Sequence, residues 1–156
     1  MTSASRKLWF LADDKELLGL MSRSIHTTLV SQEIQKMTRL RVVDNSEIGK
    51  RAMLEGKPPR CIHVYNKQSV GFLGDQVLVA IKGEKKKGIL VGLKQKQKPN
   101  VPKFDSNNIV LINDDGSPIG TRIHVPIPHV LRMKLSKQCK KGVDYTKILA
   151  IAQRFV

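Results

Sequence analysis

The residues with the clearest chemical potential are lysines that lie close together in the middle of the chain. Residues 82–98 (KGEKKKGILVGLKQKQK) hold a single glutamate and seven lysines: Lys82, Lys85, Lys86, Lys87, Lys94, Lys96 and Lys98. Ammonium groups on a hairpin can each approach a phosphate and release its counterions. The segment therefore predicts a surface that binds a nucleic acid backbone. The simpler interpretation is a solvated hairpin that is charged for solubility.

Three arginines and one asparagine extend this basic set. Arg39 and Arg41 alternate with Leu40 and Val42, which predicts a half-buried strand with a basic outer face. With Arg60 they would neutralise further phosphates. Asn45, in the run Asp44-Asn45-Ser46, either contacts RNA or belongs to a simple turn, because these side chains bond their own backbone.

The net charge supports a polyanionic partner. The formal net charge is +15, and residues 1–30 hold only four basic and three acidic side chains. Nearly all of the excess charge therefore belongs to residues 31–156, and a field of that strength attracts polyanions. Nucleic acid is the expected partner. A membrane surface comes second, because it requires a basic amphipathic helix, and the basic residues lie mostly in strand-like or loop-like segments.

Signatures of enzymes and of cofactor or metal binding are missing from the sequence. No histidine has metal-ligand spacing to a cysteine or an acid, and neither a phosphate-cradling loop nor a nucleophile elbow occurs. Asp114 and Asp115 precede Gly116 and are better explained by a turn. The sequence predicts a protein that is not an enzyme and has no cofactor. Cys61 and Cys139 are expected to be free thiols in a reducing compartment.

The few aromatic residues are scattered, so they are interpreted as core packing. Single-strand binders place aromatic side chains on a basic sheet. The sequence shows no such aromatic platform, which favours docking onto structured RNA by shape and backbone contacts.

The elements that position these residues are mainly short strands. Strands are expected around residues 39–42 and over 61–65, 76–82, 88–94, 108–113 and 119–125. Residues 83–87 would form a hairpin connection, residues 47–60 an irregular loop, and residues 129–137 a short helix. Residues 145–152 fit a strand or a helical turn. The pattern predicts an all-β domain, a small closed five-stranded barrel with a basic hairpin and a short helical C-terminal part.

Residues 1–30 are expected to lie outside this domain, which spans 31–156. Their Arg, Ser and Thr content is typical of a mitochondrial transit peptide. The acids Asp13, Asp14 and Glu16 do not fit, and Met21 as an alternative start would remove them. A disordered extension without a targeting role is the other interpretation. No apolar run approaches the length of about 20 residues that spans a bilayer.

From Ile34 to Val156 the chain resembles ribosomal protein L-fourteen of the large subunit. The matching segments follow in order: IQKMTRLRVVDNS (34–46), RCIHVY (60–65), GDQVLVAIK (74–82), KKGILVG (86–92), FDSNNIVLIN (104–113), GSPIGTRIHVPIPHVLR (116–132) and YTKILAIAQ (145–153). The chain departs from the family in a longer 47–60 segment, a shorter hairpin around Glu84–Lys87, a missing Asp-Gly before Phe104 and an insertion at 138–144.

The resemblance implies a five-stranded barrel with a structural role in the ribosome. It implies binding to large-subunit rRNA near the subunit interface, contact with small-subunit rRNA in a bridge, and pairing with ribosomal protein L-nineteen. It also implies docking of a ribosome-silencing factor at the positions of Thr121, Arg122 and Lys147. The leader suggests the mitochondrial branch, in the mitochondrial matrix. The alternatives are a free-standing OB-type single-strand nucleic-acid binder and a protein adaptor for acidic partners.

Overall fold

The computed structural model describes residues 33–95, 99, 103–138 and 145–156. The chain divides into two units, Met1–Ser31 and Gln32–Val156, and the described residues all belong to the second. The predicted leader over residues 1–30 and most of the predicted insertion at 138–144 lie outside the described residues.

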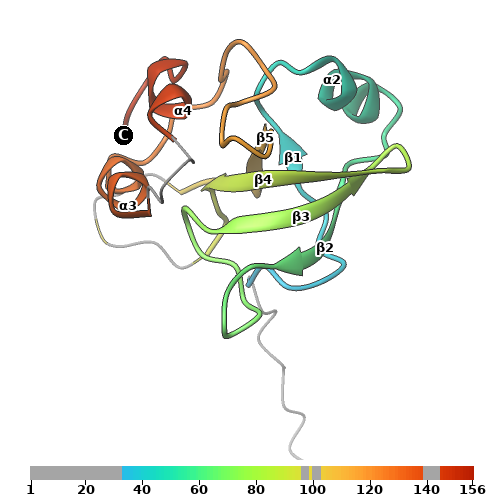
Figure 1. The fold of residues 1–156 in the computed structure, drawn as a ribbon, viewed down its shortest axis with the longest axis horizontal. Helices are drawn as coiled ribbons and strands as arrows, with labels where there is room; N and C mark the ends of the chain where they lie inside the picture. Colours follow the sequence, from blue (N-terminus) through green and yellow to red (C-terminus); the bar gives the residue numbers. More distant parts are fainter. Residues whose placement is uncertain (1–32, 96–98, 100–102, 139–144) are drawn as a thin grey trace, which may run out of the picture. The chain divides into compact units, whose positions relative to one another are not determined.

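One five-stranded sheet forms the centre of the described unit (Figure 1). Its strands are β1 (Arg41–Val42), β2 (Arg60–Val64), β3 (Gln76–Ile81), β4 (Glu84–Gly92) and β5 (Asn108–Ile112). Their order is β1-β5-β4-β3-β2, with β1 parallel to β5 and every other pair antiparallel. The fold is thus mostly β with short helices, as the sequence predicts.

The five strands do not close into a barrel, so the predicted closed barrel is not confirmed. The two edge strands β1 and β2 are not paired with each other. The residues just before β1 do reach β2, through an antiparallel bridge between Arg39 and Arg60. Backbone hydrogen bonds from Leu40 N to Pro59 O and from Cys61 N to Thr38 O accompany this bridge. The contact is too short to count as a fifth strand pairing, which would close the sheet.

The basic hairpin is tighter than the sequence analysis expected. β3 and β4 pair from Gln76–Ile89 to Ile81–Glu84, which leaves only Lys82 and Gly83 in the turn. Both have positive φ angles, 48° and 85°, and two such residues form the turn type that matches the twist of a hairpin. Lys85, Lys86 and Lys87 therefore lie within β4 and not in a connecting loop.

The prediction of an irregular loop over residues 47–60 is wrong, because the segment contains helix α2 (Glu47–Leu54). Ser46 caps its N-terminus by accepting a hydrogen bond from Gly49 N at 3.3 Å. At the other end, Gly56 has φ +67°, and the bonds from Gly56 N to Met53 O and from Lys57 N to Ala52 O complete a Schellman motif.

The C-terminal part is helical where the sequence predicted a helix. Helix α3 (Val130–Gln138) confirms the prediction over 129–137, and the 145–152 segment forms helix α4 (Thr146–Ala150). The predicted strand over 119–125 is wrong. Its residues make only isolated bridges, such as the parallel one between Ile123 and Ala152. Its backbone N–H groups bond three different segments, through Leu111 O, Ile151 O and Val43 O, so no continuous ladder with one strand forms.

Two hydrophobic clusters lie on opposite faces of the sheet, and the second covers only part of its face, since Lys85 is exposed there. One packs Val77, Val79, Ile81, Leu90 and Leu111 against Leu40 and Ala52. The other packs Ile89, Val91, Val110 and Ile112 against Leu131, Leu135 and Ile148 from the C-terminal helices. The core is aliphatic, as predicted. Cys61 is a buried free thiol, and burial raises its pKa; Cys139 lies outside the described residues.

Within the described residues, every helix is too short or too polar to cross a membrane.

Candidate nucleic-acid interface

Three of the predicted basic residues form a row across the outer face of the sheet. Arg39 lies opposite Arg60, Arg60 opposite Ala80, and Ala80 opposite Lys85. Directly opposed residues point to the same face of a sheet, and neighbouring strands are about 4.8 Å apart. The three basic side chains are exposed and spread over about 15 Å. We call Arg39, Arg60 and Lys85 the basic row.

The basic row is not neutralised by acids in the part of the chain that is described. None of the ion pairs between described residues involves Arg39, Arg60 or Lys85. Exposed cations without an acidic partner can pair with phosphates. The arrangement suits a nucleic acid backbone that lies across the strands.

Three other lysines of the predicted set are paired with acids, which the sequence did not reveal. Lys82 pairs with Glu55, Lys86 with Glu84 at 3.2 Å, and Lys87 with Asp114 at 2.6 Å. The hydrogen bond to Asp114 raises the pKa of Lys87, and the same bond lowers the pKa of Asp114. The Lys82 bond lowers the pKa of Glu55. These pairs are solvent-exposed, so they are weak and a phosphate can compete for the lysines.

Arg41 and Lys94 lie on either side of Asn107. The Asn107 carbonyl accepts a hydrogen bond from Arg41 N at 2.8 Å, and its side-chain oxygen accepts one from Lys94 N at 2.9 Å. Both basic side chains are exposed. The structure therefore divides the described basic residues of the predicted set into the basic row, the three acid-paired lysines and this second pair. Lys96 and Lys98 lie outside the described residues.

Asn45 is hydrogen-bonded to the C-terminal part of the chain. Its amide nitrogen donates to Thr121 Oγ1 at 3.2 Å, and its oxygen lies 3.2 Å from His124 Nε2. Its φ angle of 59° is left-handed, a conformation that asparagine tolerates. Asn45 thus links the predicted RNA-binding set to Thr121 of the predicted partner face.

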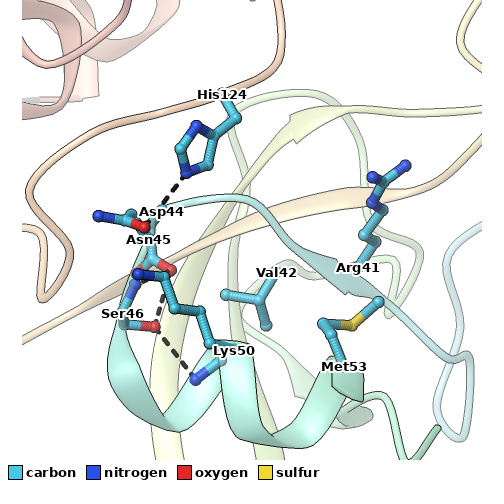
Figure 2. Close-up of a pocket in the computed structure, with 9 residues that line it drawn as sticks. Arg41, Val42, Asp44, Asn45, Ser46, Lys50, Met53 and His124 are labelled. Atoms are coloured by element: carbon cyan, nitrogen blue, oxygen red, sulfur yellow. Dashed lines mark hydrogen bonds between the residues drawn. The ribbon is translucent and has the colours of Figure 1, made fainter.

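A shallow hollow of about 170 Å³ lies beside Asn45 at the start of α2. Figure 2 shows Lys50 extending toward Asn45, whereas Arg41 points away from it. The buried Asp44 carboxylate beneath accepts hydrogen bonds from Ser46 Oγ at 2.8 Å and from Leu111 N at 3.2 Å. Burial raises the pKa of Asp44, although these hydrogen bonds oppose the effect.

The predicted partner face is anchored on Asp44 through Gly120. A Cβ on Gly120 would lie 1.4 Å from the Asp44 carbonyl oxygen, so only glycine allows this approach. Thr121 and Arg122 follow directly, and both are exposed. Lys147 is also exposed, in α4. The bridge between Ile123 and Ala152 joins the segment of Arg122 to the end of the C-terminal helical part.

His124 and Lys50 were missed by the sequence analysis as members of this site. In the sequence, His124 is weighed only as a metal ligand, and Lys50 falls in the segment 47–60 that is predicted to be an irregular loop. No signal in the sequence brings His124 to Asn45, since the two are 79 residues apart. Lys50 could have been found, because recognising the N-cap Ser46 places it at the start of helix α2, near Asn45. Among the described residues, no group of three or more His, Cys, Asp or Glu side chains could hold a metal ion.

Comparison with known proteins gives a consistent result. Residues 33–156 match the model of a family described as "Ribosomal protein L14p/L23e". The chain belongs to this ribosomal protein family. That membership confirms the family resemblance and the prediction that the chain is not an enzyme.

A Danio rerio protein named "Large ribosomal subunit protein uL14m" is similar to the chain. The two are 50% identical over 137 residues, which are 88% of this chain and 91% of that protein. The similarity extends over nearly the full length of both proteins.

Proposed function

We propose that the chain is a structural component of the large ribosomal subunit of mitochondria and supports mitochondrial translation. The name of the Danio rerio relative and the L14p/L23e family membership support this function and location. The role is architectural: the sheet presents cations in fixed positions, and large-subunit rRNA folds against them near the subunit interface.

The basic row is the observation that carries the RNA-binding role. Arg39, Arg60 and Lys85 share one sheet face and have no acidic partner among the described residues. Each cation that meets a phosphate releases counterions, so binding weakens steeply with salt. Arg41 and Lys94 beside Asn107 add a second contact region. Lys82, Lys86 and Lys87 join the interface when an rRNA phosphate replaces the carboxylate with which each is paired.

The face around Thr121, Arg122 and Lys147 is proposed to meet partners outside the large-subunit rRNA. Its exposed cations suit small-subunit rRNA in a bridge, and they also suit an acidic silencing factor that would block that bridge. Asn45 holds Thr121 in place through its amide. Ribosomal protein L-nineteen is proposed as a neighbour in the assembled subunit.

Two structural expectations belong to the same proposal. The bonds between residues 37–40 and β2 are proposed to give the open sheet a barrel-like closure in the assembled ribosome. Residues 1–30 are proposed to be a mitochondrial targeting leader.

Charge reversal in the basic row tests the RNA-binding role. A tagged variant with Arg60→Glu and Lys85→Glu is expressed in cells that lack their own copy, and its incorporation into large subunits is measured. We expect incorporation to fall severalfold, because two phosphate contacts become repulsive. The control carries Lys103→Glu and Lys137→Glu, which remove the same charge from exposed positions outside the row. Equal incorporation of both variants would reject the role of the row.

A further inference from the structure

A second hollow lies on the outer face of the sheet, next to the basic row. It has a volume of about 740 Å³ and extends from the end of β2 to the turn after β5. Hollows of about 300–1,000 Å³ are the usual size of sites for small organic groups. Lys87, which lines it, is two residues from Lys85 and therefore shares the face of the basic row.

Aromatic rings form one wall of this hollow. His63 in β2 and Tyr65 just after it lie two residues apart, with ring centroids 5.3 Å apart and planes at 87°. Tyr65 is 49% exposed, so its ring is accessible to a ligand. Tyr145 contributes to the lining as well. Exposed aromatic rings beside cations are the elements on which nucleic acid bases stack.

Polar groups in the hollow can contact the edge of a base. The Gln76 side chain lines the hollow and has no hydrogen-bond partner among the described residues. Its amide offers both a donor and an acceptor, which the Watson–Crick edge of an unpaired base also presents. Asn66 is less available, since it already bonds Val70 O and Asp75 Oδ2.

Cations lie at the rim of the hollow, where the phosphates of a nucleotide would lie. Lys67 is exposed and takes part in none of the ion pairs between described residues. Lys87 pairs with Asp114, whose side chain is 86% exposed. An ion pair this exposed contributes little to stability, so a phosphate can compete with Asp114 for Lys87.

We propose that this hollow receives one unpaired RNA nucleotide, with its base stacked on Tyr65 and its phosphates near Lys67 and Lys87. The proposal rests on the proposed function, because the nucleotide belongs to the rRNA that the basic row binds. The expectation from the sequence that the scattered aromatic residues pack in the core is wrong for Tyr65 and Phe72, which are 49% and 40% exposed. The fold brings Tyr145, which is distant in the sequence, to the same hollow as His63 and Tyr65. A peptide side chain is the competing occupant.

Chemical probing of assembled large subunits tests the proposal. Subunits that contain wild-type protein, Tyr65→Phe, Tyr65→Ala or Phe72→Ala are treated with dimethyl sulfate and with a reagent for the ribose 2′-hydroxyl. Phe72 is a matched control, because it is 40% exposed and does not line the hollow. We expect at least one rRNA nucleotide to become about fivefold or more reactive in Tyr65→Ala alone, as one base–aromatic stack is lost.

The same reactivity pattern in all four subunits would overturn the proposal, whereas normal incorporation of all four would leave the proposed function intact. If Tyr65→Ala does not assemble, ultraviolet cross-linking of wild-type subunits decides. A nucleotide attached to Tyr65 or His63 supports the proposal. A nucleotide attached only near Lys85, or a peptide attached to the segment of Tyr65, overturns it.

Discussion

Arg39 and Arg60 lie directly opposite each other in an antiparallel bridge, and neither has an acidic partner among the described residues. Like charges in directly opposed positions destabilise a sheet. The free protein therefore carries a repulsion at the point where the residues before β1 meet β2. A phosphate between the two guanidinium groups would convert this repulsion into attraction, so RNA binding and local stability are linked.

Replacing Arg60 with glutamine should stabilise the free protein and weaken its RNA binding. We expect the free energy of unfolding to rise by about 0.2–1 kcal/mol at low salt, since one cross-strand repulsion is lost. The gain should shrink as salt screens the charges. Urea unfolding at two salt concentrations measures it. Lys36→Gln is the control, because it removes the same charge from an exposed position outside the row; equal gains in both variants would contradict the account.

Gly120→Ala should destabilise the fold more than an ordinary glycine substitution. The new methyl group would lie 1.4 Å from the Asp44 carbonyl oxygen, so the backbone must move. We expect a loss of about 3 kcal/mol or more in the free energy of unfolding. Gly56→Ala is the comparison: it has no atom within 4 Å but a φ of +67°, so it should cost about 1–2 kcal/mol. Similar losses in the two variants would show that the contact with Asp44 is not tight.

Asp44 and Asp114 should influence the pH dependence of stability in opposite directions. Burial raises the pKa of Asp44 above its ordinary value of 3.8, so its contribution to stability falls as the pH rises from that value through the folded pKa. The hydrogen bond from Lys87 lowers the pKa of Asp114. Its contribution is therefore present above pH 3.8 and is lost as the pH falls through the folded pKa.

Unfolding of the wild type, Asp44→Asn and Asp114→Asn between about pH 3 and pH 7 measures both contributions. The stability of the wild type relative to Asp44→Asn should decrease with rising pH, and that relative to Asp114→Asn should increase. If the two differences in the free energy of unfolding changed with pH in the same direction, the environments assigned to Asp44 and Asp114 would be wrong.

Asn45→Gly should loosen the partner face without unfolding the domain. Glycine keeps the left-handed φ of 59° but removes the bonds to Thr121 and His124. We expect a loss of about 1–2 kcal/mol in stability, as for two partly exposed hydrogen bonds. Subunit joining or silencing-factor binding should also weaken. Arg122→Glu should leave stability unchanged and weaken the same interactions. If both variants bind partners normally, the face around Thr121 has another role.

Local signals in the sequence predicted much of the fold. Short runs of apolar residues placed β2, β3 and β5, and the alternation around Leu40 placed Arg39 and Arg41 on the exposed side. The strand expected over residues 88–94 begins earlier, at Glu84, because the turn needs only two residues. Helix α2 was also readable: Ser46 is a good N-cap, Gly56 sits at the C-terminal position that favours glycine, and Pro58 follows. The loop prediction gave the glycines and prolines too much weight.

The arrangement of the site depends on register, which the sequence does not show. The basic row requires that Arg39, Arg60 and Lys85 align across three different pairings. Shifting any strand by one residue would turn its cation to the other face. The partners of Lys82 and Lys87, which lie 27 residues away in each case, are likewise set by tertiary packing.

Sedimentation of the tagged protein from a mitochondrial lysate, with and without ribonuclease, tests the central claim most directly. The account predicts that the protein migrates with the large ribosomal subunit and leaves that position when the RNA is digested. Migration as a small free species in both conditions would contradict it, as would a large complex that survives ribonuclease.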